Sequence, residues 1–425
     1  MNKAVLVSLA SATLAVPSLA QDATRAYTAE LLSDSANRTS FQGGGGAGHD
    51  GNGFGISDGS GANALYIGGA VSFRYTMNFR DEDAGDNSDF THGFNTPNTR
   101  LWAWGHVWDK SLTYYLQFWA GDAGEWALED AWGEYAFDGG LAVRWGQMTL
   151  PILREEYIVN EKQLAVDRSA ANEVFNQDYN QGVQLTYTGE KFRVLGAFTD
   201  GIRTANTDFD SGAEADYALT ARVDFMPVGA DWNRFLDFTS FRSQDNASLI
   251  GAAIHWQDSG ETGGTASPGS ELLLYTVDAS FEGKGWNVYG AFIGQSTEVE
   301  NGGGDSDNFG GILQGGVFVS DQVELFARWD AIFWDDQTTD LAGEEVDDSH
   351  FLTAGANYYI SPESHAVKLT GEVVWAMNQT DWIYTRGDEA NSIPPGPLGG
   401  NTYNALLGNP DDGEFALRFQ MQVVF

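Results

Sequence analysis

The chain has 425 residues, no cysteine, and 60 acidic against 22 basic side chains, for a formal net charge of −38. The lack of cysteine excludes disulfide and thiol chemistry. The acidic excess argues against nucleic acid, because a phosphate-binding surface needs clustered Lys and Arg. Length alone suggests two or three soluble domains, and a large closed barrel is the single-domain exception.

The N-terminus has the features of an export signal. Lys3 precedes an apolar run from Ala4 to Ala15, Pro17 ends the run, and Ser18-Leu19-Ala20 forms a small-x-small cleavage site. The run is shorter than the ~20 residues of a membrane-spanning helix, which makes an uncleaved anchor the weaker alternative. We expect residues 1–20 to be a signal peptide.

Residues 21–63 read as a flexible leader. A short helix is expected around Leu31-Leu32, within residues 25–39, and a Gly-, Asp- and Ser-rich stretch follows over 43–61. The patch from Asp50 to Gly53 resembles a calcium loop only in composition, because it lacks the bidentate Glu and the ligand spacing. A linker is the favoured interpretation.

From residue 64 to the end, apolar and polar side chains alternate in segments of about ten residues, as they do in strands with one apolar and one polar face. The last segment places Phe415, Phe419 and Phe425 on one face and Arg418 and Gln420 on the other. Sixteen such segments are predicted: 64–78, 98–109, 111–120, 127–138, 141–149, 177–188, 191–199, 215–227, 246–257, 271–282, 285–295, 309–319, 322–334, 350–360, 366–382 and 413–425.

The connections between these segments fall into two alternating classes. Tight turns such as Asp138-Gly139-Gly140 and Ser361-Pro362-Glu363-Ser364 alternate with long loops, many of them acidic. No apolar run after residue 20 approaches the length of a spanning helix. The predicted fold class is therefore all-β: a 16-stranded antiparallel transmembrane β-barrel over 64–425, with short periplasmic turns and long extracellular loops.

The stretch after the fifth segment carries the most specific motif. It contains Gly146-Gln147, Pro151, Arg154-Glu155, Arg168-Ser169 and, after Asp178, a Gly182-Val183 strand start. This pattern resembles the third-loop region of the phosphate-selective porin O and P family. Outside this region the resemblance is architectural.

The resemblance implies a homotrimer of 16-stranded barrels in the bacterial outer membrane. It also implies that the third loop, here 150–176, folds into the lumen as a constriction. In the family an arginine ladder and a lysine cluster bind phosphate there. This loop instead mixes both charges, and its candidate constriction residues are Arg154, Glu155, Glu156, Lys162, Asp167 and Arg168.

On the predicted register, four wall arginines face the lumen: Arg144, Arg193, Arg328 and Arg418, with Arg74 and Arg100 as weaker candidates. One interpretation is an anion path, because guanidinium donors match phosphate oxygens. The favoured one is structural: the arginines pair with wall acids such as Glu134, Glu324 and Glu372. Within the loop, the candidate ion pairs that would fix the loop to the wall are Arg154 with Glu155 or Glu156, and Arg168 with Asp167 or Asp178.

The predicted function is a water-filled porin for small hydrophilic solutes or ions, non-specific or cation-leaning. A phosphate- or anion-selective channel is the alternative within this class, and a structural anchor or adhesin barrel or a soluble secreted β-protein lies outside it. We expect outer-membrane lipid and lipopolysaccharide as partners, and no enzyme activity, catalytic residue, cofactor or metal. Acidic loop pairs such as Asp305/Asp307 leave divalent-cation bridging to lipopolysaccharide open.

Overall fold

The computed structural model describes residues 47–49, 53–81, 89–121, 124–260, 269–300, 304–338, 348–380, 383, 403–409 and 412–425. Its strands are β1 (Ala47–His49), β2 (Phe54–Ser57), β3 (Ala64–Phe79), β4 (Phe90–Asn95), β5 (Thr99–His106), β6 (Leu112–Ala120), β7 (Trp126–Ala136), β8 (Leu141–Thr149), β9 (Tyr179–Thr188), β10 (Phe192–Thr199), β11 (Tyr217–Val228), β12 (Ala247–Ser259), β13 (Ser270–Gly283), β14 (Trp286–Val299), β15 (Gly304–Phe318), β16 (Val323–Phe333), β17 (Asp348–Tyr359), β18 (Val367–Ala376) and β19 (Phe415–Val424). The short helical segments are α2 (Arg154–Tyr157), η1 (Asn160–Lys162), α3 (Ala170–Phe175), η2 (Trp232–Leu236) and η5 (Tyr403–Ala405).

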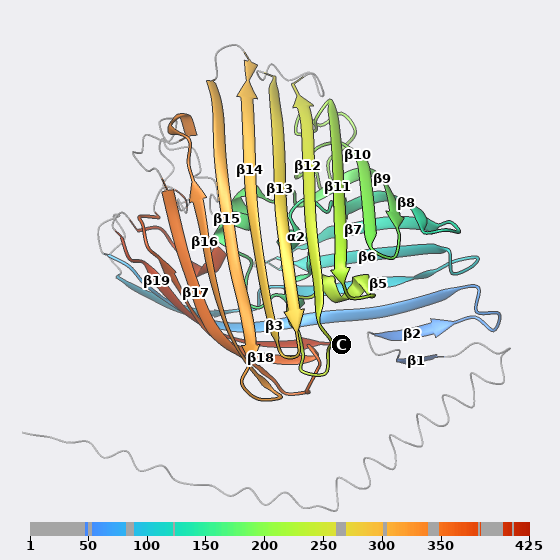
Figure 1. Ribbon diagram of the computed structural model, residues 1–425, viewed down its shortest axis with the longest axis horizontal. Coiled ribbons are helices and arrows are strands. Elements are labelled where there is room, and N and C mark those ends of the chain that lie inside the picture. The colour runs from blue at the N-terminus through green and yellow to red at the C-terminus, as the bar shows by residue number, and fades with distance from the viewer. Residues whose placement is uncertain are drawn as a thin grey trace, which may run out of the picture.

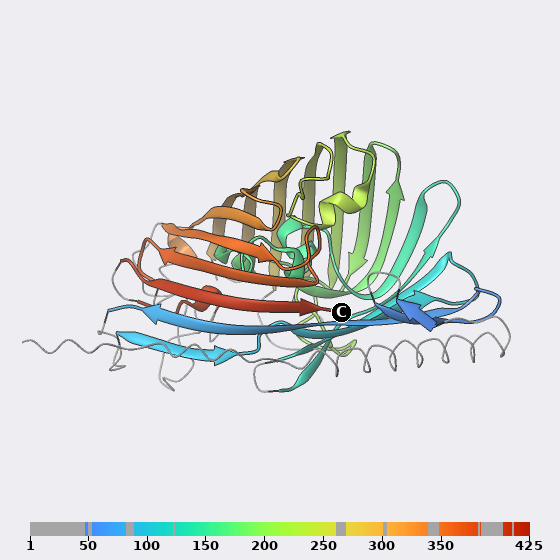
Figure 2. The ribbon, with the colours of Figure 1, turned by 90° about the horizontal axis from the view of Figure 1, so that it is seen from below.

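Sixteen of these strands, β3 and β5 to β19, form one closed antiparallel barrel. Each pairs with its neighbours in the chain, and the ring closes where β19 pairs with β3, with Phe415 opposite Phe79. Figure 1 shows β11 to β15 side by side, and Figure 2 shows the strands curving round to complete the ring. The predicted fold class is confirmed, and the strands begin and end within a few residues of the predicted segments.

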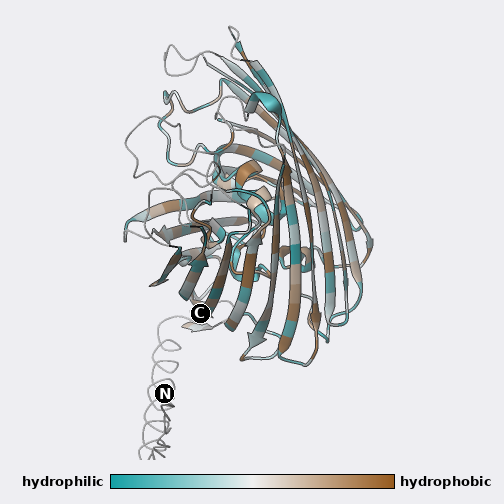
Figure 3. Cartoon of the chain, turned by 90° about the vertical axis from the view of Figure 1, so that its left-hand side faces the viewer, coloured by the Kyte–Doolittle hydropathy of each residue, from teal (hydrophilic) through white to brown (hydrophobic). Residues whose placement is uncertain are grey.

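The outer surface of the barrel is apolar because side chains alternate along every strand. On β11, Leu219 and Val223 are exposed while Thr220 and Arg222 are buried, and the last strand exposes Phe419 and buries Arg418 as predicted. Figure 3 shows the resulting alternation of hydrophobic and hydrophilic residues along the strands. None of the described helices has the length and apolar character needed to cross a membrane.

Two short strands lie where the sequence predicts a flexible leader. Because β19 reaches β3 only from Ala70 onward, the first residues of β3 would present an open edge, and β2 covers it with Phe54 opposite Ile67. β1 in turn pairs with β2. The predicted signal peptide, the predicted helix within 25–39, and residues 50–52 lie outside the described residues.

A further strand lies inside the predicted loop 80–97. β4 pairs with residues 74–79 of β3 while β5 pairs with residues 64–70, so that together they act as one interrupted strand. The interruption falls at residues 96–98, where Pro97 lacks an amide donor and Asn98 has a φ of 54°. These turn-forming residues made the segment resemble a loop.

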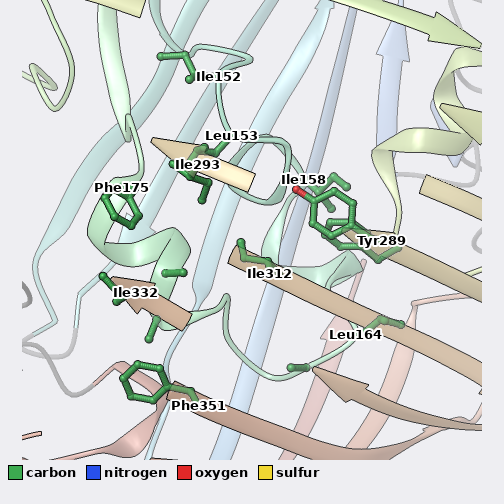
Figure 4. Packing of buried hydrophobic residues seen from close by; sticks show 14 of the residues in the cluster. Ile152, Leu153, Ile158, Leu164, Phe175, Tyr289, Ile293, Ile312, Ile332 and Phe351 are labelled. Atoms are coloured by element: carbon green, nitrogen blue, oxygen red, sulfur yellow. The ribbon is translucent and has the colours of Figure 1, made fainter. Parts of the chain in front are cut away.

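The third loop, residues 150–178, lies inside the barrel (Figure 2, green) and packs against one side of the wall. Figure 4 shows this apolar contact, in which Ile152, Leu153, Ile158, Leu164 and Phe175 of the loop face Tyr289, Ile293, Ile312, Ile332 and Phe351 of the strands. The main hydrophobic core of the molecule is thus the contact between the third loop and the barrel wall. The loop leaves space toward the opposite wall.

A second segment enters from the short-turn end. Residues 229–246 join β11 to β12, and Phe238 packs on Tyr289 with 4.8 Å between ring centroids. The Phe238 amide donates to the Lys162 carbonyl at 3.2 Å, which ties this segment to the third loop. The neighbouring Asp237 lies 2.8 Å from His365 and fixes the same part of the segment to the barrel. The segment 229–246 therefore packs against the third loop from the short-turn end of the barrel.

Candidate functional site

Asp167 is the main anchor of the third loop. It accepts two hydrogen bonds from Arg74 of β3, at 2.7 and 2.8 Å, and a further one from Arg418 of β19. Burial alone would raise the pKa of Asp167, but the two guanidinium groups outweigh it and hold the pKa far below its usual range. The loop is therefore tied to the two strands at which the barrel closes.

A second anchor lies on β16. Arg328 donates to the carbonyl oxygens of Asp167 (2.9 Å) and Arg168 (3.1 Å), and it lies 3.4 Å from the Glu155 carboxylate. Glu155 in turn accepts from both the amide and the hydroxyl of Ser169, the N-terminal cap of α3. Loop carbonyls that would otherwise be buried without donors are thus satisfied.

On the wall that faces the loop, a β-bulge in β7 determines where an acidic side chain lies. Gln117 of β6 lies opposite Asp130 and Phe118 lies opposite Leu128, so that Glu129 is the extra residue. Gln147 fixes the bulge by donating to the carbonyls of Leu128 and Glu129, each at 2.8 Å. The bulge turns Glu129 toward Arg100 of β5, which binds it through two hydrogen bonds at 2.8 and 2.9 Å.

Arg144 of β8 continues the same wall. Its guanidinium carbon lies 3.9 Å from the centre of the Trp132 ring, and Trp132 stacks on Tyr115 at 5.4 Å between ring centroids. Arg144 also lies 2.8 Å from the Glu134 carboxylate. A column of guanidinium and aromatic rings therefore runs across β6, β7 and β8.

Two adjoining cavities lie between the third loop and this wall. The first has a volume of about 150 Å³ and the second about 430 Å³, and they share Arg100, Glu156, Asn160, Arg168 and Tyr179. The first is lined mainly by β6 to β9, α2 and η1, and the second extends toward residues 203–206.

Two loop carboxyl groups beside the larger cavity are shifted toward the neutral form. Burial, assisted by the nearby Glu156, raises the pKa of Asp178 to about 6. Burial and the same neighbour raise the pKa of Glu173 well above its usual range. The negative charge of this cavity therefore grows as the pH rises through neutrality.

Residues 70–300, more than half of the chain, match the family model described as phosphate-selective porin O and P. The chain belongs to this porin family. No curated protein sequence matches the porin.

Solved structures share the fold. The anion-selective porin from Comamonas acidovorans is 14% identical over 85% of this porin and 100% of its own chain, with a TM-score of 0.57. The outer-membrane channel DcaP of Acinetobacter baumannii is 12% identical over 85% and 97%, with a TM-score of 0.55. A trimer form of OmpT from Vibrio cholerae is 12% identical over 85% and 99%, with a TM-score of 0.54. Family and fold together make this porin an outer-membrane diffusion channel.

In the folded porin, the predicted wall arginines lie beside carboxylates. Besides Arg144 and Arg328, Arg418 contacts both Asp167 and Glu372, and Arg193 lies 2.8 Å from Asp224. Glu324 instead accepts hydrogen bonds from Tyr359 and Asn357. The two weaker candidates, Arg74 and Arg100, hold the third-loop anchor and the β7 bulge.

Both predicted pairings within the loop are wrong. Arg154 contacts neither Glu155 nor Glu156 but donates to the Phe235 carbonyl and to Ser280, among aromatic rings, because α2 turns it toward the segment 229–246. Arg168 pairs with Glu156 at 3.4 Å rather than with Asp167 or Asp178. Burial lowers the pKa of Arg154. Neither Arg154 nor Lys162 lines either of these two cavities.

Sequence reasoning missed the aromatic side chains of the path, Tyr115, Trp132, Tyr157 and Tyr179, and the carboxylates Glu129 and Asp130. The alternation of the predicted segments 111–120 and 127–138 holds a partial signal, since Tyr115 and Gln117 share one face. The bulge itself has no signal in the pattern. In the described part of the chain, no group of three or more His, Asp or Glu residues is arranged to hold a metal ion.

Proposed function

We propose that this porin is a general diffusion channel with a cation-leaning preference rather than a phosphate-selective one. Its path runs between the third loop and the wall formed by β5 to β9. The charge of the residues lining the two cavities carries the proposal: four arginines stand against seven carboxylates. The arginines are Arg100, Arg144, Arg168 and Arg203, and the acids are Glu129, Asp130, Glu156, Glu161, Asp167, Glu173 and Asp178.

The pairing of the arginines supports this selectivity. Arg100, Arg144 and Arg168 each have a carboxylate partner within 3.4 Å, and Arg203 donates to the carbonyls of Glu173 and Val174. A guanidinium that braces a carboxylate contributes little net field to a passing anion. The excess of acidic over basic side chains attracts cations and repels anions along the path.

A homotrimer fits the uneven height of the barrel. Strands β5 to β10 have 8 to 11 residues, whereas β12 to β15 have 13 to 15. We propose that the short side faces the other subunits and that the tall side faces outer-membrane lipid, with lipopolysaccharide on the outer leaflet. Residues 1–20 act as a cleaved export signal, and the channel performs no enzymatic reaction.

Reversal potential in a planar bilayer tests the selectivity. In a KCl gradient, stepwise openings with a cation-side or near-zero reversal potential and no block by phosphate are expected. An anion-side reversal potential with saturable phosphate block would overturn the proposal in favour of phosphate selectivity. Well-folded protein without conductance would favour an anchor barrel.

A further inference from the structure

The short helical turn η1 is fixed firmly at the smaller cavity. The Glu161 carbonyl accepts from Lys368 at 3.4 Å and from Gln422 at 3.1 Å, and Lys368 also donates to Gln163 at 2.9 Å. The Asn160 amide nitrogen donates to Asn98 at 2.8 Å. The backbone of η1 is therefore held by the barrel wall.

Two side-chain acceptors of this fixed turn have no hydrogen-bond donor. Asn160 Oδ1 and Glu161 Oε1 are both buried without a partner in the described residues, and both residues line the smaller cavity. Glu161 is only 7% exposed. Its nearest cationic contact, Arg100 Nη1, lies 3.9 Å away and is beyond hydrogen-bond distance. A buried hydrogen-bond acceptor that has no donor costs about 1–3 kcal/mol of folding free energy, which a bound donor would recover.

The remaining lining favours a cationic donor. Four aromatic rings border the cavity, those of Tyr115, Trp132, Tyr157 and Tyr179. Aromatic faces attract ammonium groups, most strongly where water is excluded. Asp130, which also lines the cavity, forms no ion pair within 4 Å in the described part of the chain. Three guanidinium groups line the cavity as well, those of Arg100, Arg144 and Arg168, and each already has a carboxylate partner within 3.4 Å.

We propose that this cavity is a binding subsite for small solutes that carry an ammonium group. The solute's N–H groups bind Asn160 Oδ1 and Glu161 Oε1. Its positive charge lies beside the rings of Tyr157 and Tyr179, because Arg144 and Tyr115 already cover the ring of Trp132. The inference rests on the proposed cation-leaning pore and adds the class of solute that the pore retains. A solute carboxylate in the same position would face the lone pairs of these two acceptors.

Three sugars of equal ring size and different charge test the subsite: glucosamine, glucose and glucuronate. Each is added to the purified porin in a planar bilayer, and the loss of KCl conductance is measured. Half-block by glucosamine is expected at a concentration about tenfold lower than by the other two, as one cation–π contact with one hydrogen bond provides. Equal block by all three, or stronger block by glucuronate, would overturn the proposal.

Substitutions locate the effect. Glu161→Gln should weaken glucosamine block several-fold, and Tyr157→Leu should do so independently if the first variant folds poorly. Glu190→Gln, the same substitution in an exposed turn, is the matched control and should block like the wild type. Wild-type block in both cavity variants would refute the subsite.

The two proposals fail in different ways. An anion-side reversal potential in the wild type would remove the proposed function itself. A cation-leaning reversal potential without preference for glucosamine would leave the proposed function intact and remove only the subsite.

Discussion

Asp167 and Arg418, 251 residues apart in the chain, form an ion pair inside the barrel that joins the third loop to the final strand. Arg74 contacts the same carboxylate from the first barrel strand. The constriction is therefore tied to the seam at which the barrel closes, and closure and docking of the loop support each other.

The first prediction concerns this anchor. Asp167→Asn leaves the buried Arg74 without its counter-charge and Arg418 with Glu372 alone, so the free energy of unfolding should fall by about 3–5 kcal/mol. The loop should also leave the lumen part of the time, which raises single-channel conductance and its noise. Thermal unfolding in detergent and single-channel recording measure the two effects. Glu363→Gln, in an exposed turn, is the control.

The same carboxylate predicts the response to acid. Because its pKa in the folded state is depressed, Asp167 contributes stability above the pKa of the unfolded chain, and that stability is lost only as pH falls through the folded value. Loop docking should therefore persist below the usual aspartate range. Conductance recorded at pH 3 should match the loop-docked level seen at pH 7, and a rise to the level of Asp167→Asn at pH 3 would contradict this.

Selectivity, in contrast, should depend on pH near neutrality. Asp178, with its pKa raised to about 6, is largely neutral at pH 5 and ionised at pH 7.5, and Glu173 shifts in the same direction. The preference for K⁺ over Cl⁻ should therefore increase as pH rises through 6. Reversal potentials at several pH values measure it. Asp178→Asn should flatten the dependence, and a preference that decreases with pH would refute it.

The strands were predictable from the sequence because alternation reports directly which side chains meet lipid. The partners inside the lumen were not, because Asp167 pairs with residues 93 and 251 positions away, and pattern alone cannot choose among them. Family resemblance indicated that the third loop enters the barrel. It did not indicate the bulge in β7, which depends on a hydrogen bond from Gln147 across to a neighbouring strand.

The two hydrogen bonds that Gln147 donates give the family motif Gly146-Gln147 a structural role. Gln147→Leu keeps the approximate volume but removes the donors to Leu128 and Glu129, which should cost about 1–3 kcal/mol of unfolding free energy. Glu129 should then lose its fixed position beside Arg100, and selectivity should become less cationic or more variable. Thermal unfolding and reversal potentials test this, and unchanged values in both would contradict it.

The last prediction tests the lipid-facing surface of β11. Val223 and Val228 are both exposed on the outside of β11, Val223 near the middle of the strand and Val228 at its end. An arginine near the membrane midplane costs about 2–4 kcal/mol and near the interface about 0–1 kcal/mol. Val223→Arg should therefore destabilise the folded barrel in lipid clearly more than Val228→Arg. Equal effects, or stable folding of the wild type in water without detergent, would contradict a membrane-embedded β11.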